Sequence, residues 1–319
     1  KMSIFKLDPA FKDYIWGGTR LRDEYGKKCD YDKVAESWEL SCHKDGPSVV
    51  ADGEYKGLTL NEYIEKAGKG VLGKNCERFE NFPILIKLID AKDNLSVQVH
   101  PDNDYAMRVE GEYGKTEMWY VVDCDEGATL LYGFKHEITK EEFARRIADN
   151  TLLEVTNAVP VKKGDVFFIK SGTLHAIGKG ILIAEIQQNS NTTYRIYDYG
   201  RVGKDGKPRE LHVNKALDVT KLAPAEQYPE TPVEKKDGYD IKLLSKCEYF
   251  TTYRVNVETK AELDADENSF NSILVLEGEP VISGGETVSA KKGESVFISA
   301  GTGKYTVEGK CTFVLTKID

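Results

Sequence analysis

The sequence has no long apolar run and no segment typical of a secretory signal. No window approaches the roughly 18 consecutive apolar residues of a membrane-spanning helix, so we expect no membrane association. The opening residues KMSIFKLDPAF contain neither an apolar stretch nor a small-residue cleavage site, and we expect no secretory signal. The six cysteines lie far apart without a CxxC motif, which favours reduced thiols and a cytoplasmic location.

The sequence also lacks an excess of basic residues. The 44 lysines and arginines are outnumbered by 53 aspartates and glutamates, which gives a net charge of −9. A nucleic-acid surface needs a basic face, so we expect no nucleic-acid partner. The chain further lacks a glycine-rich phosphate loop, a dinucleotide fingerprint and a Ser/His/Asp order, which argues against nucleotide-dependent enzymes and serine hydrolases.

What the chain does contain is a series of short β-type runs. Its 319 residues, 40% apolar and 30% charged, are enough for two cores or for one core with a satellite. Short apolar runs separated by glycine and aspartate turns occur at 118–123, 165–170, 181–188 and 192–200. Many short strands with regular turns predict a mainly β sandwich or barrel rather than alternating β and α units.

Two segments, near 59–70 and 139–150, carry helix-start signals. In each, a threonine (Thr59 or Thr139) stands three residues before a glutamate. Such a pair can close a capping box, in which each side chain bonds the backbone N–H of the other residue. We therefore predict a small helical contribution to a mainly β protein.

The segment 222–240 separates two strand-rich regions. It is rich in proline and charge and shows no periodicity, so it is the predicted linker. We accordingly expect one domain over residues 1–221 and a second, smaller β domain over residues 241–319.

An internal repeat supports two related β units. Residues 163–173, KGDVFFIKSGT, recur as KGESVFISAGT at 292–302, a constant shift of 129 residues. The two copies differ where His175 of the first falls opposite Lys304 of the second, and no histidine follows His212. We therefore expect the second unit to hold no metal.

Four residues form a candidate metal site. Gln98 and His100 stand two apart, so in a strand both point to one face while Val97 and Val99 point to the other. Glu117 begins a later strand, and a further histidine follows a Ser-Gly-Thr turn. The candidate ligands are thus Gln98, His100, Glu117 and His175. Two imidazoles, a carboxylate and an amide oxygen suit zinc or a similar divalent ion with an open position.

The alternative for any one of these residues is a buried side chain that is merely hydrogen-bonded. The remaining histidines behave differently from the candidate ligands. His43, His136 and His212 stand in charged or turn-like contexts, so we expect all three at the surface.

The arrangement resembles the cupin pattern of a His-containing strand, a Glu about 17 residues on, and a later Gly-rich turn ending in His. Residues 164–175 fit the last element, although Lys170 stands where proline is usual. Cupins carry His-x-His in the first element. Here Gln98 replaces the first histidine, and in this respect the sequence resembles the type I phosphomannose isomerases. Further segments that resemble this family are Asp13–Gly18, Glu36–Glu39, Phe82–Lys87, Val97–Asn103, Lys115–Trp119 and Asn191–Tyr199.

The resemblance covers residues 5–220 strongly and the C-terminal part weakly. It implies two cupin-type jelly-roll β-barrels with a small helical insertion, the second one degenerate. It also implies one Zn²⁺ per chain and interconversion of mannose 6-phosphate and fructose 6-phosphate through an enediol(ate). The expected partner is a small sugar phosphate, bound by a monomer or weak homodimer.

Three residues are candidates for catalysis. Arg195 shares a strand face with Thr193, where it can meet a substrate anion or a structural carboxylate; its position matches the arginine proposed as catalytic in the family. Lys115 can contact the substrate or balance Glu117. Glu185, an acid in an apolar strand, can act as a proton shuttle with a raised pKa or pair with Arg195.

Two other functions remain open at this stage. The same ligands can hold Fe(II) in a cupin oxygenase, although the cationic Arg195 and Lys115 fit an anionic substrate better. A sugar-phosphate-binding regulator without turnover is the second alternative, and the intact ligand set argues against it.

Overall fold

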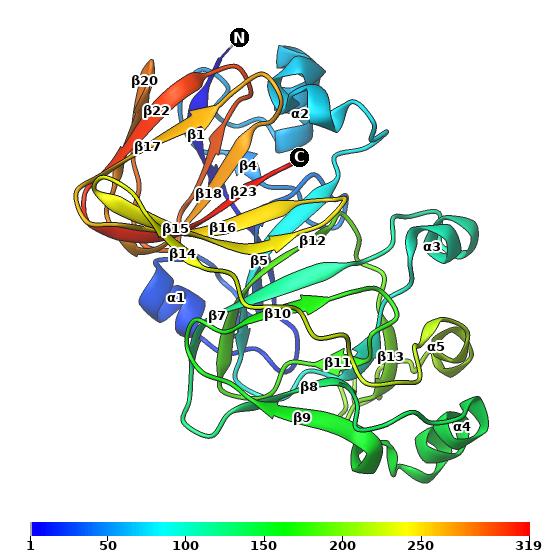
Figure 1. Ribbon diagram of the computed structural model, residues 1–319. Helices are drawn as coiled ribbons and strands as arrows, with labels where there is room; N and C mark the ends of the chain where they lie inside the picture. The colour runs from blue at the N-terminus through cyan, green and yellow to red at the C-terminus, as the bar shows by residue number, and fades with distance from the viewer. Residues whose placement is uncertain (1) are drawn as a thin grey trace.

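The computed structural model describes residues 2–319 (Figure 1). Its strands form four antiparallel sheets, which confirms the predicted mainly β fold. The eight-stranded sheet runs β14 (Val233–Lys235), β15 (Tyr239–Lys246), β16 (Thr251–Val257), β23 (Cys311–Lys317), β18 (Asn271–Gly278), β21 (Ser295–Ile298), β1 (Ile4–Asp8) and β4 (Val49–Val50). The four-stranded sheet runs β17 (Lys260–Ala265), β22 (Gly303–Glu308), β19 (Val281–Gly284) and β20 (Glu286–Ser289).

The other two sheets build the half of the molecule that contains the candidate site. The six-stranded sheet runs β10 (Val166–Ile169), β7 (Glu117–Cys124), β12 (Ile181–Gln188), β5 (Ile84–Ala91), β3 (Glu36–Leu40) and β2 (Ala10–Lys12). The five-stranded sheet runs β13 (Tyr194–Tyr197), β6 (Val97–Val99), β11 (His175–Ala176), β8 (Thr129–Phe134) and β9 (Thr156–Pro160). Every one of the four sheets has two free edges, so the strand pairing closes no barrel, contrary to the prediction.

The six-stranded sheet lies between two apolar layers. On one face, Ile86 and Met118 pack in a core shared with the eight-stranded sheet, which contributes Phe297. On the other face, Ile89 and Trp119 pack in a core shared with the five-stranded sheet. All residues of β5 and β12 are buried, which explains why apolar residues occur on both faces of each strand without strict alternation.

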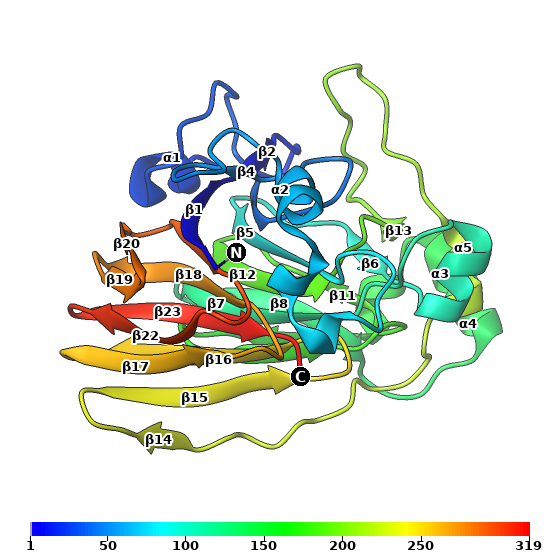
Figure 2. The same ribbon diagram turned by 90° about the horizontal axis from the view of Figure 1, so that it is seen from above.

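Helices cover the outer face of the five-stranded sheet. The helices of the chain are α1 (Arg20–Tyr25), α2 (Leu60–Ala67), α3 (Asn103–Val109), α4 (Lys140–Asp149) and α5 (Val213–Val219), with 3₁₀ turns at η1 (Lys69–Leu72), η2 (Lys74–Cys76) and η3 (Leu152–Val155). Helices α3, α4 and α5 gather on one side of the molecule (Figures 1 and 2). In α4 and α5, Phe143 and Ala216 share a core with Val97 and Val99 of β6, so Gln98 must point inward.

The two predicted helices begin where their threonines indicate. At α2 the capping box is complete, because Thr59 accepts from the N–H of Glu62 at 3.2 Å and the Glu62 carboxylate accepts from the N–H of Thr59 at 2.9 Å. At α4 only half of the box forms. Thr139 accepts from the N–H of Glu142, but the Glu142 carboxylate instead accepts from Arg146 at 2.8 Å, one turn further on.

The internal repeat falls on β10 and β21, which begin and end 129 residues apart. In the first copy Ile169 of β10 pairs with Glu117 of β7, and in the second Ile298 of β21 pairs with Asn271 of β18. Asn271 therefore occupies the position of the candidate ligand Glu117.

Strand pairing also crosses the predicted boundaries. Strands β1 and β4, near the N-terminus, complete the eight-stranded sheet formed by the C-terminal strands. The predicted linker 222–240 contains β14, which pairs with β15. Among the described residues, no helix is both long and apolar enough to cross a membrane.

The prediction that His43 lies at the surface is wrong. His43 is buried, its Nε2 bonds the Glu112 carboxylate, and its Nδ1 accepts from the N–H of Asp45. Burial by itself would raise the pKa of Glu112, but hydrogen bonds from His43 and Thr192 outweigh it and hold that pKa below its ordinary value. His136 is exposed as expected, and His212 is half-buried.

We predict that Phe5→Ala lowers the free energy of unfolding by about 3–5 kcal/mol, because the substitution leaves a cavity in a packed core. Phe5 of β1 stacks on Phe297 at 5.3 Å and meets Tyr63 edge-on at 4.8 Å between ring centroids. Denaturant unfolding measures the change. The exposed Val233→Ala on β14 is the matched control and stays within about 0.5 kcal/mol of the wild type.

The hydrogen-bond network of Glu112 predicts an acid-dependent contribution to stability. Because the folded-state pKa is lowered, this contribution is present above about pH 4 and is lost as the pH falls through the folded-state pKa. Glu112→Gln lacks it, so the difference in unfolding free energy between wild type and variant narrows below about pH 4. Denaturation curves from pH 7 to pH 3 measure this difference, and a constant difference would contradict the prediction.

Candidate functional site

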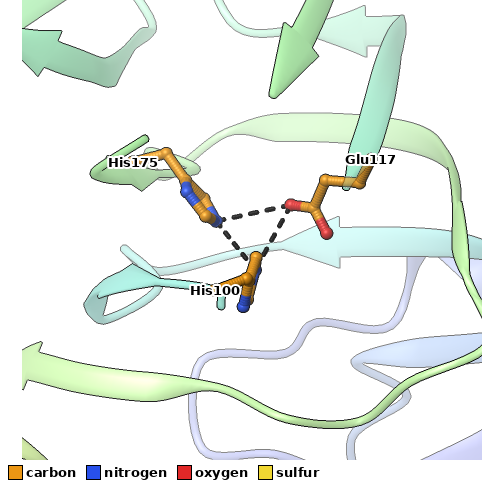
Figure 3. A group of neighbouring side chains, drawn as sticks. All are labelled: His100, Glu117 and His175. Carbon is orange, nitrogen blue, oxygen red and sulfur yellow. Dashed lines mark hydrogen bonds and ion pairs between the residues drawn. The ribbon is translucent and has the colours of Figure 1, made fainter. Parts of the chain in front are cut away.

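The three strongest metal-ligand candidates meet between the six-stranded and five-stranded sheets (Figure 3). Glu117 begins β7, His175 begins β11, and His100 directly follows β6. The two Nε2 atoms lie 3.0 Å apart, and Oε1 of Glu117 lies 3.5 Å from His100 Nε2 and 3.3 Å from His175 Nε2. All three side chains are buried.

These spacings fit a tetrahedral metal ion. Zinc binds histidine nitrogens and carboxylate oxygens at about 2.0–2.2 Å, which places two ligands of a tetrahedral site about 3.3–3.5 Å apart. The observed separations are close to that value without any rearrangement. Three protein ligands leave a fourth position open, which is typical of catalytic rather than structural zinc sites.

Backbone carbonyls orient both imidazoles. The Nδ1 of His100 bonds the Thr192 carbonyl at 3.0 Å, and the Nδ1 of His175 bonds the Thr173 carbonyl at 2.8 Å. Each Nδ1 therefore carries the proton, and each Nε2 directs its lone pair towards the cluster. Thr192 is itself held by Glu112, which accepts from its hydroxyl at 2.7 Å, so the environment of His43 also supports the site.

The protonation states favour metal binding. Burial, together with the charge of Lys115, lowers the pKa of His100 to about 3, so this imidazole is neutral at physiological pH. Burial alone would raise the pKa of Glu117. The charge of Lys115, whose Nζ lies 2.6 Å from Glu117 Oε2, outweighs that effect and holds the pKa of Glu117 well below its usual range.

Gln98 lies beside the cluster on the inner face of the five-stranded sheet. It pairs with His175 on one side and with Arg195 on the other. Its amide nitrogen donates to the carbonyl and hydroxyl of Ser96 at 3.1 and 3.2 Å. That arrangement leaves Oε1 as the atom of Gln98 that is available to a metal ion.

A row of buried charges continues from the cluster along the six-stranded sheet. Glu185 lies 3.9 Å from both Lys115 and Lys87, and it accepts from the indole of Trp119 at 3.2 Å. Lys87 in turn lies 3.4 Å from Glu36. Burial and the nearby Glu117 raise the pKa of Glu185 to about 8 despite the two lysines.

Sequence reasoning missed Lys87 and Glu36. Each lies on the inward face of its strand, which carries one other charged residue, Asp90 in β5 and Glu39 in β3. The prediction that Glu185 acts as a proton shuttle or pairs with Arg195 also omitted them. The cationic neighbours of Glu185 are Lys87 and Lys115.

A cavity of about 210 Å³ opens beside the cluster, and Arg195 lies on its wall. The Arg195 guanidinium donates to the Glu210 carbonyl at 2.9 Å, and within residues 2–319 no carboxylate oxygen lies within 4.0 Å of it. The structural salt bridge weighed as an alternative is therefore not formed. Other residues that line the cavity are Tyr14, Trp16, Glu36, Lys87, Gln98, Lys115, Glu117, Trp119, His175, Glu185, Asn191, Thr193 and Arg209.

The sequence matches two family models and several known proteins. Residues 4–127 match the family model described as "Phosphomannose isomerase type I, catalytic domain", and residues 240–318 match "Mannose-6-phosphate isomerase, cupin domain". The mannose-6-phosphate isomerase ManA of Bacillus subtilis (strain 168) is 39% identical over 312 residues, which cover 97% of this chain and 97% of the relative.

Two solved structures share the fold. The mannose 6-phosphate isomerase from Bacillus subtilis aligns with a TM-score of 0.93 at 38% identity, covering 98% of this chain and 99% of that one. A zinc-bound mannose 6-phosphate isomerase aligns with a TM-score of 0.79 over 99% of this chain and 100% of that one; at 18% identity this likeness concerns the fold alone. Because a relative of 39% identity spans nearly the whole chain and the catalytic-domain match includes His100 and Glu117, the chain belongs to the type I mannose-6-phosphate isomerase family.

Proposed function

We propose that this chain is a metal-dependent isomerase that interconverts mannose 6-phosphate and fructose 6-phosphate through an enediol(ate). The observation that carries the proposal is the buried His100, Glu117 and His175 cluster with tetrahedral spacing, beside a cavity whose wall includes Lys115 and Arg195. The substrate of such an enzyme is an anion, and cationic walls suit it.

We propose one Zn²⁺ per chain, held by His100, Glu117 and His175, with Gln98 Oε1 as a further ligand. The ion supplies Lewis-acid polarisation of the substrate oxygens as the enediolate forms. Two imidazoles that present Nε2 and one carboxylate are a donor set that this ion prefers, and the Nδ1 hydrogen bonds to the Thr192 and Thr173 carbonyls support it.

The protein groups carry the proton between C1 and C2. Glu185, with a pKa of about 8, is a proposed proton shuttle because a carboxyl group with a pKa near neutral both gives and takes a proton readily. Lys115 is proposed to contact substrate oxygens; the position of its Nζ beside Glu117 and His100 at the cavity wall supports this role. Arg195 is proposed to hold the anionic substrate.

We also propose the finer description of the fold. Two cupin-type jelly rolls occupy residues 1–221 and 241–319, joined through 222–240, and the second jelly roll holds no metal. The repeated strand pairing of β7 with β10 and of β18 with β21 supports it, as does Lys304 at the repeat position of His175. The six free cysteines fit the proposed cytoplasmic location, where the enzyme acts as a monomer or weak homodimer.

The first test is turnover of mannose 6-phosphate to fructose 6-phosphate before and after chelation. We expect activity to disappear with the chelator and to return with zinc, and His175→Ala to lower kcat/KM on the order of a thousandfold because it removes a metal ligand. A coupled assay and elemental analysis of bound zinc measure both effects. His136→Ala, an exposed histidine, is the matched control and keeps wild-type turnover.

Each outcome has a distinct meaning. Absence of turnover in zinc-replete protein would overturn the isomerase. Oxygen consumption with bound iron would point to an oxygenase, and binding of mannose 6-phosphate without conversion would point to a regulator.

Lys115→Met separates its two possible roles. If Lys115 contacts the substrate, the variant retains zinc and loses about 100-fold in kcat/KM, because a charged group that stabilises the transition state is removed. If Lys115 only balances Glu117, the affinity for zinc changes while turnover of zinc-saturated protein does not. Zinc titration and steady-state kinetics on one preparation distinguish the two, and we expect the first result.

A further inference from the structure

The carbonyl that orients His100 belongs to the loop between β12 and β13. Thr192, which provides this carbonyl, stands in the segment 189–193 that joins the two strands. A displacement of the carbonyl turns the imidazole and moves its Nε2 away from the position of a metal ion. The geometry of the metal site therefore depends on what holds this segment of backbone.

The carbonyl that orients His175 is held in a different way. It belongs to Thr173, in the turn that precedes β11. The N–H of Thr173 donates to the Lys170 carbonyl at 3.0 Å, and the N–H of Gly172 donates to the His100 carbonyl at 2.8 Å. Main-chain hydrogen bonds thus fix this turn, whereas segment 189–193 is held by a side chain from a distant part of the sequence.

That side chain is Glu112, in the loop between α3 and β7. Its Oε1 accepts from the N–H of Asn191 at 3.0 Å, and its Oε2 accepts from the hydroxyl of Thr192 at 2.7 Å. Hydrogen bonds to an ionised group are roughly twice as strong as neutral ones, and the lowered pKa of Glu112 keeps it ionised at neutral pH. Two such bonds, from adjacent residues to one carboxylate, fix the backbone beside the Thr192 carbonyl.

His43 fixes Glu112 in turn. The Nδ1 of His43 accepts from the N–H of Asp45 at 3.1 Å, so the neutral ring carries its proton on Nε2 and donates it to Oε1 of Glu112. The ring is buried and meets the indole of Trp38 edge-on, at 5.7 Å between ring centroids. Because Trp38 is itself fully buried, the histidine is a rigid support for the carboxylate.

We propose that Glu112 and Thr192, supported by His43, are positioning residues of the metal site and set its affinity for zinc by fixing the carbonyl that orients His100. None of these three side chains belongs to the ligand cluster or lines the catalytic cavity. The inference rests on the zinc site of the proposed function. It adds that the affinity of this site depends on one hydroxyl-to-carboxylate hydrogen bond outside it.

The paired variants Thr192→Val and Thr192→Ser separate positioning from packing. Valine keeps the shape of threonine but removes the hydroxyl, whereas serine keeps the hydroxyl and loses only a methyl group. Because changes to the partners of metal ligands weaken metal binding, we expect the zinc dissociation constant to rise about 10-fold in Thr192→Val and to stay within about threefold of wild type in Thr192→Ser. Competition with a chromophoric chelator measures both constants.

Cobalt substitution gives a readout of the geometry of the site. The visible absorption of bound Co²⁺ depends on the arrangement of its ligands. We expect the spectrum of Co²⁺-loaded Thr192→Val to differ from that of the wild type and the spectrum of Thr192→Ser to coincide with it. A packing defect would give the reverse order, since serine leaves the larger gap.

Two further variants complete the experiment. Glu112→Gln keeps the shape of the side chain and removes its charge, so its zinc dissociation constant also rises about 10-fold, whether or not Thr192→Val folds. Thr59→Val is the matched control. It removes a hydroxyl that caps α2, far along the chain from the metal ligands, and destabilises that helix while leaving zinc affinity and the cobalt spectrum unchanged.

Zinc affinity and the cobalt spectrum are measured without substrate, which separates this inference from the proposed isomerase reaction. A loss of zinc affinity in Thr192→Val and Glu112→Gln, but not in Thr192→Ser or Thr59→Val, supports the inference even if mannose 6-phosphate is not turned over. Equal zinc dissociation constants in Thr192→Val and Thr192→Ser, or wild-type zinc affinity in folded Glu112→Gln, would overturn it even in a fully active isomerase.

Discussion

The burial of the six-stranded sheet on both faces is the constraint on which the active region depends. Because successive side chains of a strand point to opposite faces, β5, β7 and β12 each send one set of residues to the core shared with the eight-stranded sheet and the other set into the space beneath the five-stranded sheet. Lys87, Glu117 and Glu185 belong to the second set. Because both faces of the sheet are buried, these charged side chains are removed from water. Each therefore requires an opposite charge or a metal ion beside it.

In the interior between the two sheets, acidic and basic side chains alternate, so each buried charge has an opposite charge beside it. Glu36, Lys87, Glu185, Lys115 and Glu117 follow one another with separations of 2.6 to 3.9 Å. Such a buried network contributes little net stability, since the desolvation of each charge offsets the attraction. Its effect is on the two acids: the pKa of Glu117 is held well below its usual range, whereas that of Glu185 is raised to about 8.

Strands β16, β18 and β23 of the eight-stranded sheet repeat the pairing of β5, β7 and β12 in the six-stranded sheet. Where Glu185 pairs with Lys87 between β12 and β5, Leu315 pairs with Tyr253 between β23 and β16. At this position a pair without charge therefore replaces the charged one, and Leu315 packs in a hydrophobic core with Val255 and Ile273. This half still matters to the first, because the eight-stranded sheet covers the back of the six-stranded one.

The sequence by itself determined what depends on local geometry. Two-residue spacing put Gln98 on the inward face, threonine caps set the starts of two helices, and the 129-residue shift located equivalent strands. Only the tertiary structure decided which inward residues meet. Lys87 beside Glu185, Arg209 beside the cavity and the burial of His43 each depend on contacts between segments far apart in the chain, and no local periodicity records them. The open edges of the sheets were likewise undetermined, because strand propensity indicates that a strand forms but not which neighbour completes it.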